Sequence, residues 1–202
     1  MICIDAPQLD YLEIVFFNQI DFDSPRLAQF LNRTPKFRSR GEAHVQFYGG
    51  GDVVVRLKYW THKSGHAFWI KTTCREPDWP LSFIAQVLNS SLPPLSMVED
   101  LYIGNLYWGP VWKNDTVENT LWLELLLPFT AVKNLYLRRE FAPSIVAALQ
   151  ELVGDRITEV LPSLRNIFVR MLEPLGPFQE HIGQFVAARQ LSGHPVAISV
   201  WD

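Results

Sequence analysis

The chain has 202 residues, of which 48% are hydrophobic and 19% are charged, and its formal net charge is −3. This composition excludes a disordered chain, and the lack of excess positive charge argues against nucleic-acid binding by phosphate neutralisation. Two cysteines are too few for a disulfide framework, and no apolar run reaches the roughly 18 residues that a membrane span needs. We therefore expect one soluble domain over residues 1–202, cytoplasmic or nuclear, that binds neither nucleic acid nor membrane.

The amino-terminal part of the chain is rich in alternating strand patterns. Three of these patterns are separated by turns too short to hold a helix, including a glycine turn at residues 49–51. We therefore expect an antiparallel β excursion near residues 43–74, in which residues 53–59 lie outside the order of the main sheet. The expected strands cover residues 9–17, 42–48, 53–60 and 68–72.

A six-residue phrase, apolar-x-x-apolar-aromatic-apolar, occurs three times in the middle of the chain. Its copies at residues 98–103, 132–137 and 164–169 each follow a proline, and their central apolar residues lie 34 and 32 positions apart. A repeat of this length predicts units of one strand with a return path, which bury their apolar faces by stacking on one another. One further strand is expected at residues 196–201.

Helical patterns lie between these strands. A unit of one strand and one helix at about 30 residues predicts an α/β fold, a leucine-rich-repeat-like right-handed solenoid with a parallel sheet and outer helices. Residues 177–202 are expected to form its carboxy-terminal cap. The helices are expected after Ser24 and Pro25, over residues 81–88 and 121–126, over 145–152 with a C-cap at Gly154, and over 178–189.

The repeated phrase also predicts a surface. In each copy the aromatic residue lies between two core residues, so it points to the face of the sheet away from the core. Aromatic residues flanked by arginine and asparagine are typical of protein-binding hot spots, although aromatic side chains also stabilise a sheet by cross-strand packing alone. The predicted protein-binding residues are Tyr102, Asn134, Tyr136, Arg138, Asn166, Phe168 and Arg170.

The chemical motifs of the chain favour binding over catalysis. The glycine run at 49–51 precedes a strand, which argues against a phosphate loop. His62 and His66 with Cys74 lack the spacing of a metal site, and the carboxylate pairs Glu118 with Glu124 and Glu76 with Asp78 are typical of ordinary surface groups. We expect no catalytic residue, no metal and no cofactor, and we expect most of the seven tryptophans to fill the core.

Several longer phrases carry a resemblance to a known family. They occupy residues 16–22, 74–79, 127–137, 140–143, 148–152 and 183–195. Together they resemble the leucine-rich-repeat half of the basidiomycete family of F-box-like proteins. The resemblance implies a fungal protein that recognises a protein partner as a substrate receptor of a cullin–RING ubiquitin ligase, or a paralogue of such a receptor.

The same resemblance leaves the ligase connection conditional. Repeat-like sequence begins by about Leu9, so the F-box that would bind the ligase adaptor is expected only upstream of Met1. Without it, the alternative is a free-standing scaffold or decoy repeat protein. A more remote alternative is a small-molecule enzyme, which would need a deep polar pocket with perturbed carboxylates.

Overall fold

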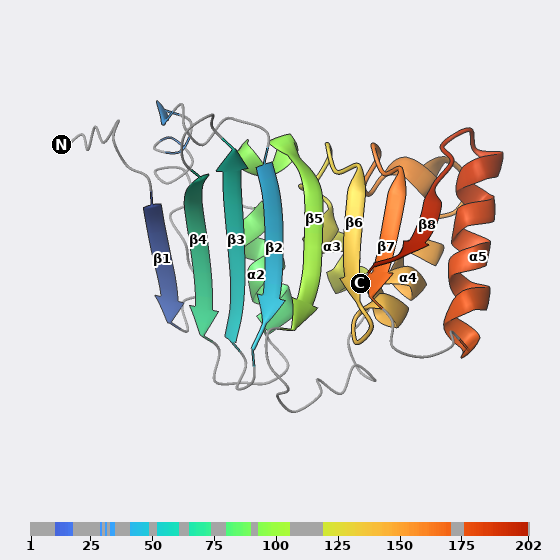
Figure 1. The fold of residues 1–202 in the computed structure, drawn as a ribbon, viewed down its shortest axis with the longest axis horizontal. Coiled ribbons are helices and arrows are strands. Elements are labelled where there is room, and N and C mark those ends of the chain that lie inside the picture. Colours follow the sequence, from blue (N-terminus) through green and yellow to red (C-terminus); the bar gives the residue numbers. More distant parts are fainter. Residues whose placement is uncertain are drawn as a thin grey trace.

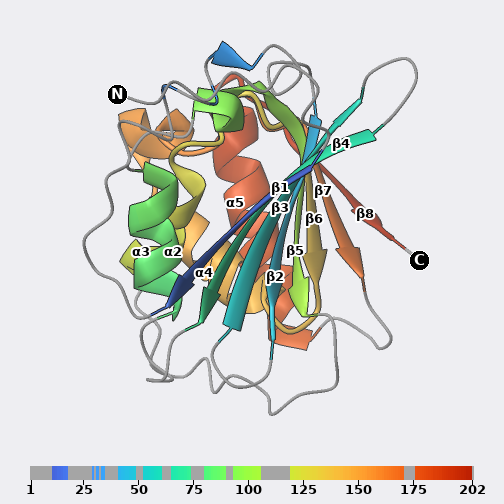
Figure 2. The same ribbon diagram turned by 90° about the vertical axis from the view of Figure 1, so that its left-hand side faces the viewer.

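The described residues form an α/β fold: one mixed β-sheet whose helices lie on a single face (Figures 1 and 2). The computed structural model describes residues 11–17, 29, 31, 33–34, 41–48, 52–60, 65–73, 80–89, 93–105, 119–170 and 176–201. The strands are β1 (Tyr11–Phe17), β2 (Gly41–Phe47), β3 (Asp52–Trp60), β4 (Gly65–Thr73), β5 (Val98–Asn105), β6 (Asn134–Arg138), β7 (Asn166–Arg170) and β8 (Ala197–Val200). The helices are α2 (Pro80–Asn89), α3 (Asn119–Leu126), α4 (Ala142–Gln150) and α5 (Gly176–Leu191), with short 3₁₀ helices at Pro93–Met97 and Gly154–Thr158.

The three copies of the repeated phrase form neighbouring parallel strands. Leu101 on β5 pairs with Leu135 on β6, and Leu135 pairs with Ile167 on β7. These three side chains are buried, as are their partners two residues later, Ile103, Leu137 and Val169. The prediction that the repeated apolar residues form one parallel, buried array is confirmed.

The amino-terminal strands enter the same sheet in a different order. The sheet has eight strands in the order β1-β4-β3-β2-β5-β6-β7-β8, and β2, β3 and β4 pair antiparallel. The antiparallel excursion is therefore confirmed, but the expectation that residues 53–59 lie outside the main sheet is wrong. β3 lies inside the sheet because its residues are apolar on both sides: Val53, Val54 and Val55 are all buried.

The helices form a layer behind the sheet, where α2 packs on α3, α3 on α4 and α4 on α5 (Figure 2). Large rings lock this layer to the strands: Phe47 of β2 stacks on Phe141 at a centroid distance of 4.7 Å, and Trp122 of α3 meets both edge-on at 5.9 Å. The predicted stripe of α4 is buried. That helix ends at Gln150 with Glu151 as its C-cap, so the C-cap expected at Gly154 is wrong; Gly154, at φ 59°, begins the following 3₁₀ turn instead.

The two ends of the sheet are edge strands. At one end β1 pairs with β4 and with no other described strand, and Tyr11 and Val15 are exposed. At the other end β8 extends the sheet beyond β7, and its helix-side residues Ile198 and Val200 are exposed. Of the helix expected after Ser24 and Pro25, residues 29, 31 and 33 are described, and they are helical. Leu31 and Thr34 are buried, and the Leu31 carbonyl accepts a hydrogen bond from the Thr34 N–H.

Candidate functional site

Among the described residues, all the helices lie on one face of the sheet, and we call the other face the open face (Figure 2). Side chains alternate along each strand, so pairing in register places the open-face residues of neighbouring strands side by side. The register defines a central row that crosses the whole sheet. From β1 to β8 this row contains Glu13, Trp69, Arg56, His44, Tyr102, Tyr136, Phe168 and Ser199.

Four rings of this row stack face to face, and we call them the aromatic ladder: His44, Tyr102, Tyr136 and Phe168. Their successive centroid distances are 4.5, 4.2 and 4.6 Å, with interplanar angles of 5°, 7° and 11°. These distances follow from the spacing of strands, about 4.8 Å, which holds in-register rings at stacking distance. The pairing of the strands thus places the four rings at stacking distance from one another.

The environment of the ladder keeps its two phenols neutral. Partial burial raises the pKa of Tyr102 above its ordinary value, and the neighbouring Tyr136 phenol and the Glu42 carboxylate act in the same direction. Burial also raises the pKa of Tyr136, together with the negative charge of Asp100. Both hydroxyl groups are half-buried hydrogen-bond donors at neutral pH.

A second row, parallel to the ladder, is joined by amide hydrogen bonds. Asn166 Nδ2 donates to Asn134 Oδ1 at 2.7 Å, and Asn134 Nδ2 donates to Asp100 Oδ1 at 2.7 Å. Because an amide side chain has both a donor and an acceptor, Asn134 can accept a hydrogen bond from one strand and donate one to the next. The orientation of all three groups is thereby set.

On the opposite side of the ladder the open face is basic. Arg138 and Arg170 occupy paired positions on β6 and β7, and Arg138 donates a hydrogen bond to the Asn105 carbonyl. On β5 the next position in this row is Gly104, which pairs with Gln46 of β2. The rings of the ladder thus lie between a polar row with a carboxylate and a row with two guanidinium groups.

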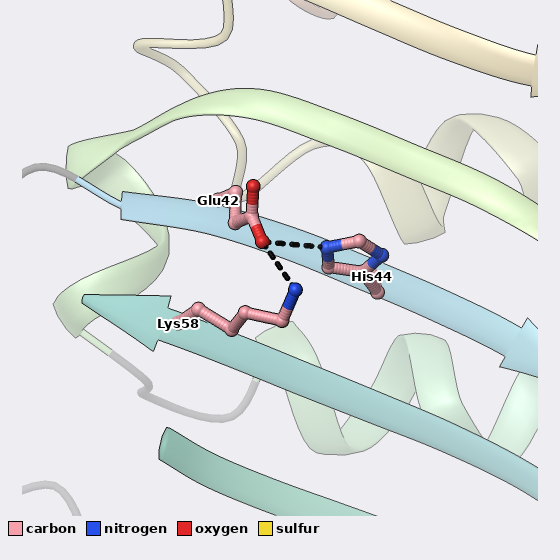
Figure 3. A network of polar contacts seen from close by, with 3 residues as sticks. All are labelled: Glu42, His44 and Lys58. Carbon is pink, nitrogen blue, oxygen red and sulfur yellow. Dashed lines mark hydrogen bonds and ion pairs between the residues drawn. The ribbon is translucent and has the colours of Figure 1, made fainter. Parts of the chain in front are cut away.

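A charged network fixes the β2 end of the ladder (Figure 3). Glu42 Oε1 lies 3.0 Å from His44 Nε2 and accepts a hydrogen bond from Lys58 Nζ at 2.5 Å. The hydrogen bond to His44 is the main cause that lowers the pKa of Glu42 to about 2, and Lys58 adds to it against the opposing effect of burial. The Glu42 carboxylate thus helps to hold the His44 imidazole parallel to the Tyr102 ring.

The central row continues beyond His44 as a cation–π contact. The Arg56 guanidinium carbon lies 3.8 Å from the centroid of the Trp69 ring, and Tyr11 of the edge strand meets the same ring edge-on at 5.5 Å. Tyr11, Arg56 and Trp69 do not belong to the hydrophobic core, which lies on the helix side of the sheet. Trp69 and Trp201 are therefore on the open face, and the expectation that tryptophans fill the core holds for Trp122 alone among the three whose side chains are described.

All seven residues predicted as the binding site lie on the open face, on β5, β6 and β7. The structure brings their aromatic, amide and arginine members into three adjacent rows. Sequence reasoning missed His44, Arg56, Trp69 and Trp201, together with the Glu42–Lys58 pair. The alternation of residues 42–47 was a signal for the outward position of His44, but its place beside Tyr102 depends on the long-range pairing of β2 with β5.

The chemical alternatives are only partly covered by the described residues. His62, Cys74, Glu76, Asp78, Glu118 and the glycine run at 49–51 lie outside them, as does the side chain of His66. Glu124 is exposed on α3. Within the described ranges, no three His, Cys, Asp or Glu side chains are grouped to hold a metal ion, and no helix is long and apolar enough to cross a membrane.

The arrangement is suited to recognition by contact. Stacked rings offer flat apolar area, the amide row and the phenols offer directed hydrogen bonds, and the arginines offer charge.

Comparison with family models, with curated proteins and with solved structures finds no match to this chain.

Proposed function

We propose that this protein is a protein-interaction module whose open sheet face binds a protein partner. The observation that carries the proposal is the aromatic ladder, four stacked rings on a helix-free face between a hydrogen-bonded amide row and two arginines. Aromatic and arginine side chains are enriched among the residues that dominate binding energy at protein interfaces. Rings held in place by the sheet also lose little conformational entropy on binding, which favours affinity.

The finer part of the proposal is that the fold is a leucine-rich-repeat-like solenoid. It is supported by the in-register parallel strands β5, β6 and β7, by the helix that follows each of them, and by the sequence period of 34 and 32 residues. The antiparallel strands β2–β4 depart from a simple repeat. We propose that they widen the binding face, because their outward residues extend the same central row.

The resemblance to F-box-like proteins suggests the biological setting: substrate recognition for a ubiquitin ligase. This setting requires an F-box upstream of residue 1 in the natural gene product. Co-precipitation of the cullin-ligase adaptor with the natural full-length product tests it. Partner binding without adaptor binding would instead assign the protein to the scaffold or decoy alternative.

The binding face itself is tested by a double substitution, Tyr136→Ala with Arg138→Ala. Affinity capture from cells that express the protein identifies partners of the wild-type chain, and each partner is then titrated against the purified variants. We expect the double variant to lose affinity by about thirtyfold or more, the effect of removing a central aromatic hot spot. Circular dichroism and a melting curve show whether the variant is folded.

The matched control places the same number of substitutions on the helical side. Gln184→Ala with Gln190→Ala changes two exposed residues of α5. Partner affinity should be unchanged in this control. A partner that tolerates the open-face variant and is lost with the α5 variant would overturn the proposal, and so would a folded open-face variant that binds like wild type.

A further inference from the structure

The carboxy-terminal end of the chain lies over the aromatic ladder. In Figure 1 the end marked C lies in front of β6, and in Figure 2 it lies on the side of the sheet opposite the helices. The Trp201 ring meets Tyr136 edge-on at a centroid distance of 5.4 Å and an angle of 73°, and meets Tyr102 at 5.9 Å and 66°. Trp201 therefore contacts the two rings at the centre of the proposed binding face.

This contact is more than a continuation of strand pairing. The backbone N–H of Trp201 donates a hydrogen bond to the Val169 carbonyl at 3.1 Å, which keeps the backbone of Trp201 beside β7. Tyr136 and Tyr102 belong to β6 and β5, the second and third strands from β8. At about 4.8 Å per strand, the indole must extend back across β7 to reach them. Edge-to-face packing on the rings is a preferred aromatic geometry, so the ladder accounts for this position.

The strand that carries Trp201 gains little from the core. All four residues of β8 are exposed, and Val200, directly before Trp201, is 64% exposed. Trp201 is less exposed than the strand that precedes it. Among residues 197–201, the best-covered side chain is thus the one that rests on the ladder.

The surroundings of Trp201 are cationic. Arg170 is the nearest charged group of the strand next to β8, and its guanidinium carbon lies 5.8 Å from the indole centroid. Arg138 occupies the paired position on β6. In the sequence an acidic residue, Asp202, directly follows Trp201. An aromatic residue followed by an acidic one matches the stacking rings and the two arginines in both shape and charge.

We propose that Trp201 is an internal occupant of the binding face, and that the partner presents an extended segment with an aromatic residue followed by an acidic residue, which displaces it. This inference rests on the proposed function and names the chemistry of the partner. Apparent affinity for such a segment is reduced by the fraction of molecules in which Trp201 occupies the ladder. Because Trp201 is tethered, its effective concentration near the ladder is high, and removal of its ring exposes the site.

The test uses the chain's own last six residues as a labelled probe, the peptide Ala-Ile-Ser-Val-Trp-Asp, titrated by fluorescence anisotropy. We expect Trp201→Ala to bind the probe about tenfold more tightly than wild type. Trp201→Phe keeps a smaller ring on the ladder and should bind with intermediate affinity. Adding Tyr136→Ala to Trp201→Ala should abolish the gain.

Two altered probes separate the chemistry of the site from strand addition at the sheet edge. A probe with alanine for tryptophan should bind wild type and Trp201→Ala alike, since it cannot occupy the ladder. A probe with asparagine for aspartate should bind Trp201→Ala several-fold more weakly than the parent probe at low salt. That difference should shrink as salt screens the arginines.

Equal affinity of the parent probe for wild type and for folded Trp201→Ala would overturn the inference, as would a gain that survives Tyr136→Ala. If partner capture still depends on Tyr136 and Arg138 in that case, the proposed function stands without an internal occupant. Partner capture that ignores Tyr136 and Arg138 overturns the proposed function, whatever the probe does.

Discussion

Gly104 lies directly beneath the side chain of Arg138. A Cβ atom built at Gly104 would come within 2.8 Å of Arg138 Cδ and 2.9 Å of Cγ, closer than carbon atoms pack. The missing side chain lets Arg138 lie flat across β5, where its guanidinium donates to the Asn105 carbonyl. The glycine thus holds an arginine of the proposed binding face in one orientation.

Gly104→Ala should therefore displace Arg138 while the strand remains paired. We expect the substitution to cost about 1 kcal/mol of unfolding free energy in the wild-type background, the usual cost of a modest overpacking. With Arg138→Ala already present the same change should be neutral or slightly stabilising, because the clash is gone and alanine restricts the unfolded chain. A double-mutant cycle by chemical denaturation measures this coupling. Additive effects of the two substitutions would show that the contact is absent.

The middle of the fold was predictable because its pairing is local in the repeat. Each copy of the phrase pairs with the next copy along the chain, so the spacing of Leu101, Leu135 and Ile167 predicts both the register and the buried face. The amino-terminal strands offered no such guide. Val45 pairs with Val55 and also with Ile103, and a spacing count cannot show which of several apolar strands lies beside another.

The same difference explains what was missed in the site. Tyr102, Tyr136 and Phe168 follow from alternation within one repeated phrase. His44 joins them only because β2 lies beside β5, and Trp201 only because its indole extends from beside β7 back across the open face. One signal for the interior place of β3 was present: Val53, Val54 and Val55 form a continuous apolar run, which is typical of a strand covered on both faces.

Leu135→Ala should destabilise the protein by about 2–5 kcal/mol, the range for truncating a fully buried leucine. Because Leu135 pairs with Leu101 and Ile167, hydrogen exchange should speed up in β5 and β7 as well as in β6. Leu191→Ala is the matched control, since Leu191 is 90% exposed. An unfolding free energy equal to that of the control would mean that Leu135 lies outside the core.

The buried Arg189 side chain links α5 to the segment between α4 and β7. It is 1% exposed, and its two terminal nitrogens donate to the Ile157 carbonyl at 3.0 Å and the Leu164 carbonyl at 3.2 Å. Burial lowers its pKa from the ordinary value. Arg189→Met should cost about 2–4 kcal/mol, because two carbonyl groups lose their donors without access to water.

Urea denaturation measures this cost. Arg189→Lys keeps the charge without the planar pair of donors, so its loss should be substantial as well. Gln190→Met, at the exposed neighbouring position, is the control and should change the free energy of unfolding by less than about 0.5 kcal/mol. A methionine variant as stable as this control would show that the two hydrogen bonds contribute nothing.

The edge strand β1 should drive self-association at high protein concentration. Within the described part of the chain it pairs on one side, with β4, and Tyr11 is 46% exposed and Val15 37% exposed. Val15→Lys places a charge on this edge, a common means of preventing strand-to-strand association. We expect light scattering to show concentration-dependent oligomers for wild type and fewer for Val15→Lys. Val153→Lys, at an exposed site on the loop after α4, should behave like wild type; a wild-type chain that stays monomeric would contradict the prediction.

The carboxylate of Glu42 should make stability depend on pH in an acidic window. Its pKa is about 2 in the folded protein against 4.5 for an unperturbed glutamate, because His44 and Lys58 bind the ionised form. A folded-state pKa below the unfolded value means that folding favours the deprotonated group. The contribution to stability is therefore complete above about pH 4.5 and is lost as the pH falls from 4.5 towards 2.

Glu42→Gln removes that contribution and tests its size. We expect the variant to be less stable than wild type at pH 6 by on the order of 2 kcal/mol, a value kept below the full pKa difference because Lys58 is partly exposed to solvent. The gap should narrow between pH 4.5 and pH 2, since protonated glutamate and glutamine are then alike in charge. Glu124→Gln, on the exposed face of α3, is the control and should change the free energy of unfolding at pH 6 by less than about 0.5 kcal/mol. Denaturation curves for Glu42→Gln that keep a constant offset from wild type down to pH 2 would show that the network with His44 and Lys58 does not hold the carboxylate ionised.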